Sequence, residues 1–358
     1  KFQCSNLFPY QTNKMGNCNT KATDDIIFPS EPDPSPLTST PTVKIFAHPN
    51  TAFSLFFCHA LALKSVPFHL VPSNHNSLVF GTNVFSGSRE SLLRVLDRKF
   101  PHPRHPKLVP PSSALCRKEG SLLVLLVQGD TTPLVARMIT LHHKSIAWHL
   151  ERLIQRFEDL KTRGRTKGGA RLIKKGDNGT DLAALNAKLE MKEFGERLNW
   201  LMEVLIEHSQ IEERIVFPFL RAADQGFDRT TGEEHESHID IMNGIKEVAK
   251  IIQEGNRNLQ EARINLTYRV KLLERSCKAH FEEEQRHVLP LMEKMNLSEE
   301  QQYKMVSRSL DLMKATHSHL LSFLMEGLLP WETMLYLDLI VRCKEESQAV
   351  GILRRISR

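Results

Sequence analysis

Four long segments with apolar residues at helical spacing constrain the fold of this chain more than any other feature. In the second of them, Phe194, Leu198 and Leu205 recur at intervals that place them on one face of a helix. Such a face has to be buried against other helices, so the pattern predicts a mainly α fold that contains an antiparallel four-helix bundle. The four segments cover residues 134–160, 182–221, 233–253 and 259–295.

Two of the segments carry the same motif, in which a glutamate follows a histidine by four positions and a proline follows it by ten. The copies read HSQIEERIVFP, with His208 and Glu212, and HFEEEQRHVLP, with His280 and Glu284. Both His–Glu pairs continue the apolar stripe of their helix. All four side chains are therefore predicted to point into the core.

A buried carboxylate requires a positive partner, because burying one alone costs on the order of several kcal/mol. The apolar stripes of these two helices contain no Lys or Arg. A bound cation would supply the charge, and imidazole with carboxylate suits iron, manganese or zinc. The alternative is a pair of structural His–Glu hydrogen bonds, but two copies in matching register favour a metal site.

The other two segments offer further histidines as ligands. The first contains His142, His143 and His149, and periodicity does not separate His142 from His143. The third contains His235 and His238, of which His238 is in better phase with the apolar residues. The residues alone therefore predict one histidine from each of these helices without deciding which one.

The second half of the chain resembles the hemerythrin-like proteins, also called HHE cation-binding domains, and their plant members in particular. The resemblance runs from about residue 134 to 331 and rests on HHKSIAWHLERL, EHSQIEERIVFPFL, EEHESHIDIM and AHFEEEQRHVLPLMEKM. It implies a non-haem di-iron centre in which the two glutamates bridge the irons and histidines complete the coordination. The implied ligands are His143, His208, Glu212, His235, His280 and Glu284. His142 and His238 remain alternative ligands.

One spacing departs from the oxygen-carrying members of that family. They have two histidines four positions apart on the third helix, whereas His235 and His238 are three apart. We therefore expect one iron to hold fewer histidines and to leave a position for water, dioxygen or nitric oxide. The predicted function is sensing or handling of iron, dioxygen or nitric oxide. The alternatives are a di-iron oxidase, peroxidase or nitric-oxide-handling enzyme, and a membrane-associated interaction protein with little bound metal.

Residues 43–109 predict a smaller α/β module with the order strand, helix, strand, hairpin and helix, as in an abridged thioredoxin-like unit. KIFAHPNTAFSLFFCHALALKSVPFHLVP and SGSRESLLRVLDRKFP are similar to the N-terminal half of a glutathione-transferase-like domain. In that family, Ser88 and Glu90 would lie near the group that holds the γ-glutamyl end of glutathione. The position of the reactive Ser, Tyr or Cys instead reads PNTA from Pro49. A degenerate docking or structural module is expected.

Composition predicts the remaining boundaries. The N-terminal residues are polar and rich in Pro, Ser and Thr, which is typical of a disordered tail. A Gly- and Lys-rich stretch, KTRGRTKGGARLIKKG, is expected to be a solvated loop between the first two helices. The predicted parts are a tail at 1–42, the module at 43–109, a linker at 110–132, the bundle at 133–332 and a C-terminal helical tail at 333–358.

Charge and cysteine usage bear on location and partners. The net charge of +6 is too small to indicate a specific nucleic-acid partner, and no protein partner is indicated. Six scattered cysteines without a C-x-x-C pair favour free thiols and a cytoplasmic location. MGNCNTK from Met15 fits a myristoylation motif. A start at Met15 would allow lipidation of Gly16 and Cys18 and attachment to the cytoplasmic face of the plasma membrane; otherwise these residues belong to the tail.

Overall fold

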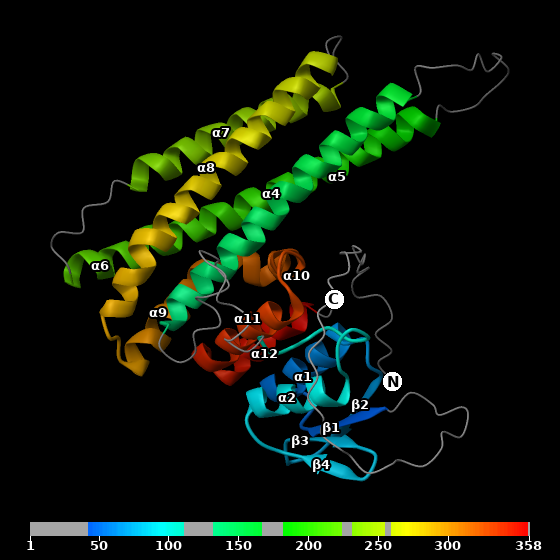
Figure 1. Ribbon diagram of the computed structural model, residues 1–358, viewed down its shortest axis with the longest axis vertical. Helices are drawn as coiled ribbons and strands as arrows, with labels where there is room; N and C mark the ends of the chain where they lie inside the picture. The colour runs from blue at the N-terminus through cyan, green and yellow to red at the C-terminus, as the bar shows by residue number, and fades with distance from the viewer. Residues whose placement is uncertain (1–41, 111–131, 167–181, 224–230, 255–258, 357–358) are drawn as a thin grey trace, which may run out of the picture.

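The molecule has long helices at one end and a small β-sheet at the other (Figure 1). None of the described helices combines the length and the apolar character that a membrane span needs. The predicted lipidation sites Gly16 and Cys18, most of the basic loop and nearly all of the linker lie outside the described residues. The computed structural model describes residues 42–110, 132–166, 182–223, 231–254 and 259–356.

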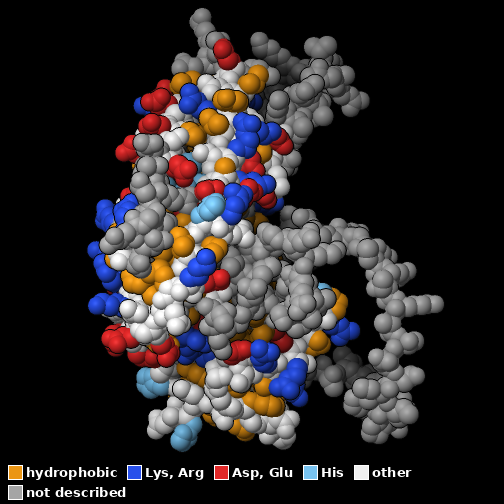
Figure 2. Space-filling model, turned by 60° about the vertical axis from the view of Figure 1, so that its left-hand side comes forward, with side chains coloured by type: hydrophobic (Ala, Val, Ile, Leu, Met, Phe, Trp, Pro, Cys, Tyr) orange, Lys and Arg blue, Asp and Glu red, His pale blue; other side chains and the backbone are white. Residues whose placement is uncertain are grey.

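Four helices form the predicted antiparallel bundle. α4 packs against α5 and α8, and α7 packs against the same two helices, so the four close into a ring. Their apolar stripes fill the interior with residues such as Phe194, Leu205 and Leu273, which are almost fully buried. On the face shown in Figure 2, acidic and basic side chains are interspersed. The helices are α4 (Leu134–Thr166), α5 (Leu182–Ile211), α7 (Thr231–Gln253) and α8 (Leu259–Lys294).

The second predicted segment, residues 182–221, is helical but is interrupted by a π-helical turn. After α5, a π-helical turn η3 spans Glu212–Val216, and α6 then spans Phe217–Ala223. The backbone N–H of Phe217 donates to the carbonyl of Glu212, five residues back. Pro218 follows this turn and has no N–H to restore the α-helical bond at the next position. The proline of the first motif therefore accompanies a π turn that begins at Glu212.

The proline of the second motif does not end its helix. Pro290 lies inside α8, which continues to Lys294. Another proline starts a helix, because Pro330 is the first residue of α11 and its missing N–H costs nothing there. The predicted end of the bundle at residue 332 falls inside α11, and the domain boundaries themselves stay predictions.

Shorter helices follow the bundle and pack against it. α9 and α11 both contact α4, and the π-helical turn η4 contacts α5. Ser298 caps α9 and forms a reciprocal capping box with Gln301. These elements are α9 (Glu299–Leu312), η4 (Thr316–Leu320), α10 (Leu321–Glu326), α11 (Pro330–Cys343) and α12 (Glu346–Ile356).

The N-terminal part has the predicted order of strands and helices. Its sheet has the strand order β2-β1-β3-β4, with β1 parallel to β2 and antiparallel to β3. Gly81 turns β3 into β4 with a φ of 61°, which favours glycine. The elements are β1 (Val43–Ala47), α1 (Ala52–Leu63), β2 (Phe68–Pro72), β3 (Ser77–Phe80), β4 (Asn83–Phe85) and α2 (Arg89–Lys99).

The C-terminal helices hold this module through polar contacts. The N–H of Ala52, at the start of α1, donates to Oε1 of Glu346 at 2.7 Å. His59 lies 3.0 Å from the Leu353 carbonyl. The carboxylate from α12 thus lies at the N-terminal end of α1, beside the PNTA residues.

Ser88 and Glu90, the residues expected near a γ-glutamyl group, are engaged within their own helix. The Ser88 hydroxyl caps α2 by accepting from the N–H of Ser91. Glu90 pairs with Arg94 at 2.6 Å. The resemblance of the module to glutathione transferases stays a prediction.

Candidate metal centre

Six of the predicted side chains, from all four bundle helices, meet in the interior. α4 contributes His143, and α7 contributes His235. The other two helices contribute the repeated motifs, one of them through the π turn that carries Glu212. Each side chain is at most 4% exposed: His143, His208, Glu212, His235, His280 and Glu284.

Among the described residues, these side chains form two groups in which one possible ligand atom from each member lies within 4.8 Å of the others. Glu212 belongs to both groups, so the two positions for a cation share one carboxylate. We name them position A, formed by His143, His208, Glu212 and Glu284, and position B, formed by Glu212, His235 and His280.

At position A, the ring nitrogens face one another and the carboxylates. Nε2 of His143 lies 3.1 Å from Nε2 of His208 and 3.2 Å from Oε2 of Glu284. Nε2 of His208 lies 3.1 Å from Oε1 of Glu212. Four donor atoms that converge at these distances are arranged as metal ligands are.

Position B has the same character. Nε2 of His235 lies 3.1 Å from Nε2 of His280 and 3.2 Å from Oε2 of Glu212. Oε1 of Glu284 is 3.7 Å from Nε2 of His280. Each glutamate therefore directs one oxygen toward each position, as a carboxylate that bridges two ions does.

The charge of the cluster fits a cation. All four carboxylate oxygens of Glu212 and Glu284 are buried and accept no hydrogen bond from the described residues. Burial would raise the pKa of Glu212, but the imidazoles of His208, His143 and His235 hold that pKa well below its usual range. Burial would lower the pKa of His280, yet Glu212 and Glu284 raise it to about 9. An ionised carboxylate this deeply buried requires a positive partner, which protonated imidazoles or a bound cation can supply.

The two alternative ligands lie outside both groups. Nε2 of His142 is 3.3 Å from the hydroxyl of Tyr336 on α11. Nε2 of His238 is 3.0 Å from Oγ of Ser276 on α8. Helical phase could not separate the two alternative ligands from His143 and His235, because all four histidines are buried. The assignment of ligands stays a prediction, which the geometry supports for His143.

The remaining histidines of the bundle region lie away from the cluster. His149 is buried and contacts the Phe323 carbonyl through Nε2 at 2.7 Å. His317 is also buried, with Nδ1 3.1 Å from the Leu310 carbonyl. The side chains of His287 and His319 are 57% and 55% exposed.

Two glutamates that the sequence analysis missed stand behind position B. Oε1 of Glu213 lies 2.7 Å from Nδ1 of His235, and Oε2 of Glu234 lies 2.7 Å from Nδ1 of His280. Both glutamates are neighbours of a proposed ligand in sequence. An acidic residue directly beside a candidate ligand was the signal, but such residues are common on exposed helix faces.

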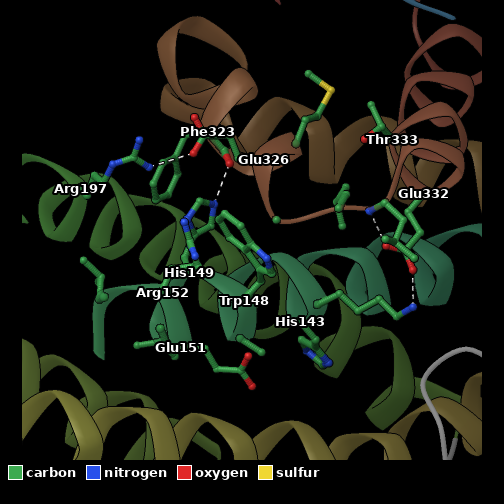
Figure 3. Close-up of a pocket in the computed structure, with 18 of the residues that line it drawn as sticks. His143, Trp148, His149, Glu151, Arg152, Arg197, Phe323, Glu326, Glu332 and Thr333 are labelled. Atoms are coloured by element: carbon green, nitrogen blue, oxygen red, sulfur yellow. Dashed lines mark hydrogen bonds and ion pairs between the residues drawn. The ribbon is translucent and has the colours of Figure 1, made fainter. Parts of the chain in front are cut away.

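A cavity of about 1220 Å³ adjoins position A (Figure 3). It is lined by α1, α4, α5, α8 and the helices after the bundle, and His143 is among the lining residues. Its wall includes Trp148 and also Phe281, whose ring stacks on His143 with centroids 4.0 Å apart. Cys277 also lines it, and burial raises the pKa of this thiol to about 12. The cavity thus reaches one proposed ligand from outside the bundle.

Comparison with known proteins identifies the bundle. Residues 134–292 match the model of the hemerythrin HHE cation binding domain family. This region is a hemerythrin-type domain. The match confirms the family resemblance predicted for this region, and together with the buried His–Glu cluster it supports metal binding by the bundle.

One curated relative is similar to part of the chain. "Zinc finger protein BRUTUS" of Arabidopsis thaliana is 30% identical over 147 residues, which are 40% of this chain and 11% of that protein. The chain therefore matches only a small part of this relative's length. No solved structure matches the chain.

Proposed function

We propose that this chain is a non-haem di-iron protein that senses or handles iron, dioxygen or nitric oxide. The observation that carries the proposal is a set of four buried carboxylate oxygens that lie among imidazole nitrogens and accept no hydrogen bond within the described part of the chain. The proposed ligands are His143, His208 and Glu284 at position A, His235 and His280 at position B, and Glu212 at both.

Imidazole and carboxylate suit iron, and also manganese and zinc, which remain the other metals to test. When bound, a metal pair would supply coordination positions for water or a small ligand, because each position has two histidines and shares its carboxylates. The surrounding side chains fix the orientation of the ligating rings. Phe281 contributes by stacking on one face of His143.

Metal analysis of the full chain tests this proposal. After anaerobic incubation with Fe(II) and removal of free metal, we expect about two irons per chain. Replacing both glutamates, Glu212→Ala with Glu284→Ala, should abolish binding because the site then has no negative charge. Unchanged iron content in the double variant would refute the assignment.

A second candidate function is a di-iron oxidase, peroxidase or nitric-oxide-handling enzyme with the same ligands. The cavity beside His143 favours it, because its volume of about 1220 Å³ would admit an organic molecule next to position A. Sustained consumption of dioxygen, peroxide or nitric oxide by the reduced iron-loaded chain would support an enzyme. A single stoichiometric reaction would support a binding protein.

A third proposal is an interaction protein attached to a membrane surface. It depends on lipidation of Gly16 and Cys18. Mass spectrometry of the protein from its natural source tests this directly, because an intact peptide that spans residues 13–17 excludes N-terminal acylation at Gly16. Iron addition that leaves the melting temperature unchanged would favour this proposal over a metal-dependent one.

A further inference from the structure

Behind position B, two glutamates hold the histidines on the side that faces away from the cation. Glu213 contacts Nδ1 of His235 and Glu234 contacts Nδ1 of His280, each at 2.7 Å. Because Nδ1–H donates to the carboxylate, Nε2 is left as the nitrogen that faces the cation. Glu213 and Glu234 each follow or precede a proposed ligand in sequence, but each contacts a histidine of another helix.

Behind position A, the corresponding atoms have no partner among the described residues. Nδ1 of His143 and Nδ1 of His208 are buried and make no hydrogen bond to this part of the chain. The ring of His143 stacks on Phe281, which makes its surroundings apolar on that side. Each position has two histidines and Glu212, and position A also has Glu284. Among the described residues, only position B has carboxylates behind its histidines.

We propose that the metal centre loads in two steps, with position B filled first and position A filled at a higher metal concentration. This inference rests on the proposed metal-binding function. A carboxylate behind a ligating imidazole fixes the orientation of the ring and makes it a stronger donor. Loss of such a partner costs about ten- to a hundred-fold in metal affinity.

Charge favours the same order. The side chains of Glu213 and Glu234 are 43% and 49% exposed, and their negative charge attracts cations to the side of position B. The histidines that they brace are almost fully buried directly beneath them. Glu213 and Glu234 are positioning residues, because they contact the histidines and not the cation.

Two-step loading would allow the chain to distinguish two metal concentrations. At free metal concentrations between the two dissociation constants, only position B holds a cation, and the oxygens of Glu212 and Glu284 that face position A have no bound cation. At concentrations above both constants, a cation at each position balances the negative charge of the two glutamates. A centre of this kind reports a rise in metal as a change from one bound ion to two.

Equilibrium dialysis of the full chain against anaerobic Fe(II) tests the order, because it measures bound iron at each free concentration. For the natural sequence we expect two steps whose dissociation constants differ by about tenfold or more. In the double variant Glu213→Gln, Glu234→Gln, the tighter step should weaken by about tenfold or more while the weaker step stays within about twofold. Glutamine keeps an acceptor oxygen, so the folded structure is expected to persist.

Two further variants assign the steps. Glu283→Gln is the matched control, because the side chain of Glu283 is 44% exposed and precedes Glu284 but contacts His287 instead of a proposed ligand. It should leave both steps unchanged. His208→Gln removes a histidine of position A alone, and the one step that remains should have the affinity of the tighter step.

Three results would overturn the inference while leaving the proposed function intact. They are loading of both irons in one step, equal weakening of both steps in the Glu213→Gln, Glu234→Gln variant, and a remaining step of weak affinity in His208→Gln. A natural chain that binds no iron would overturn the proposed function as well, so the two failures are distinguishable.

Discussion

Nε2 of His142 lies 3.3 Å from the hydroxyl of Tyr336, which joins the helix that bears His143 to α11. The same hydroxyl lies 3.0 Å from Nε2 of His317. All three side chains are buried. The helices that follow the bundle are therefore anchored one residue away from a proposed metal ligand.

Tyr336→Phe should lower the free energy of unfolding by about 1 to 3 kcal/mol, because it leaves two buried imidazole nitrogens without a partner. Urea denaturation of the metal-free chain measures the change. Tyr268→Phe is the control, since Tyr268 is 60% exposed and its change should stay within about 0.5 kcal/mol. Equal effects of the two substitutions would show that the buried hydroxyl contributes nothing.

Gly327→Ala should destabilise the fold by about 1 to 3 kcal/mol through overpacking. A Cβ at Gly327 would lie 2.7 Å from Cα of Ser145 on α4, and a backbone atom cannot rotate away. Gly351→Ala has no atom within 4 Å of the new Cβ and lies in α12, so it should stabilise by about 0.5 to 1 kcal/mol. Thermal unfolding of both variants checks that the two changes have opposite sign.

Acid should destabilise the metal-free chain through His149. Burial lowers the pKa of this imidazole from 6.5 to about 3, despite its contact with the Phe323 carbonyl. Between pH 6.5 and about 3, His149 is protonated in the unfolded chain but neutral in the folded chain. The contribution of neutral His149 to the free energy of unfolding is therefore complete above pH 6.5 and is lost as the pH falls toward 3. At about pH 5.5 the loss amounts to about 1.4 kcal/mol.

Comparison of urea denaturation at about pH 7.5 and about pH 5.5 measures the contribution of His149 to the free energy of unfolding. The pH dependence of His149→Gln should be smaller than that of the natural chain by about 1.4 kcal/mol. His287→Gln should leave it unchanged, because the side chain of His287 is 57% exposed. An identical pH dependence in all three proteins would mean that His149 titrates normally.

Glu346→Ala should loosen the contact between the N-terminal module and α12. The carboxylate accepts from the N–H of Ala52, and loss of such a helix cap costs about 1 kcal/mol. Limited proteolysis should then cleave within residues 43–109 faster than in the natural chain. Glu345→Ala changes an exposed neighbour and serves as the control; equal cleavage rates would contradict the capping role.

Periodicity and motif spacing predicted much of this fold from the sequence. The helices α4, α5, α7 and α8 follow from their apolar stripes, and Glu212 with Glu284 follows from a repeated motif that places carboxylates on those stripes. These features are local in sequence, so one chain is sufficient to find them.

Long-range contacts decided the rest, and they have no local signal. His142 and His143 are both buried, so only the distance to other helices separates them. Glu213 and Glu234 are partly exposed, and nothing in the local sequence separates them from other acidic residues on helix surfaces. Their role depends on contacts with imidazoles of other helices. The contact of Glu346 with Ala52 joins residues 294 positions apart.

The central claim is that one carboxylate, Glu212, serves two cation positions. The most direct test is the iron-to-protein ratio of Glu212→Gln beside that of the natural chain, measured after anaerobic loading. We predict about two irons in the natural chain and loss of iron from both positions in the variant, because each position loses the charge of the shared ligand. A variant that retains both irons would contradict the account.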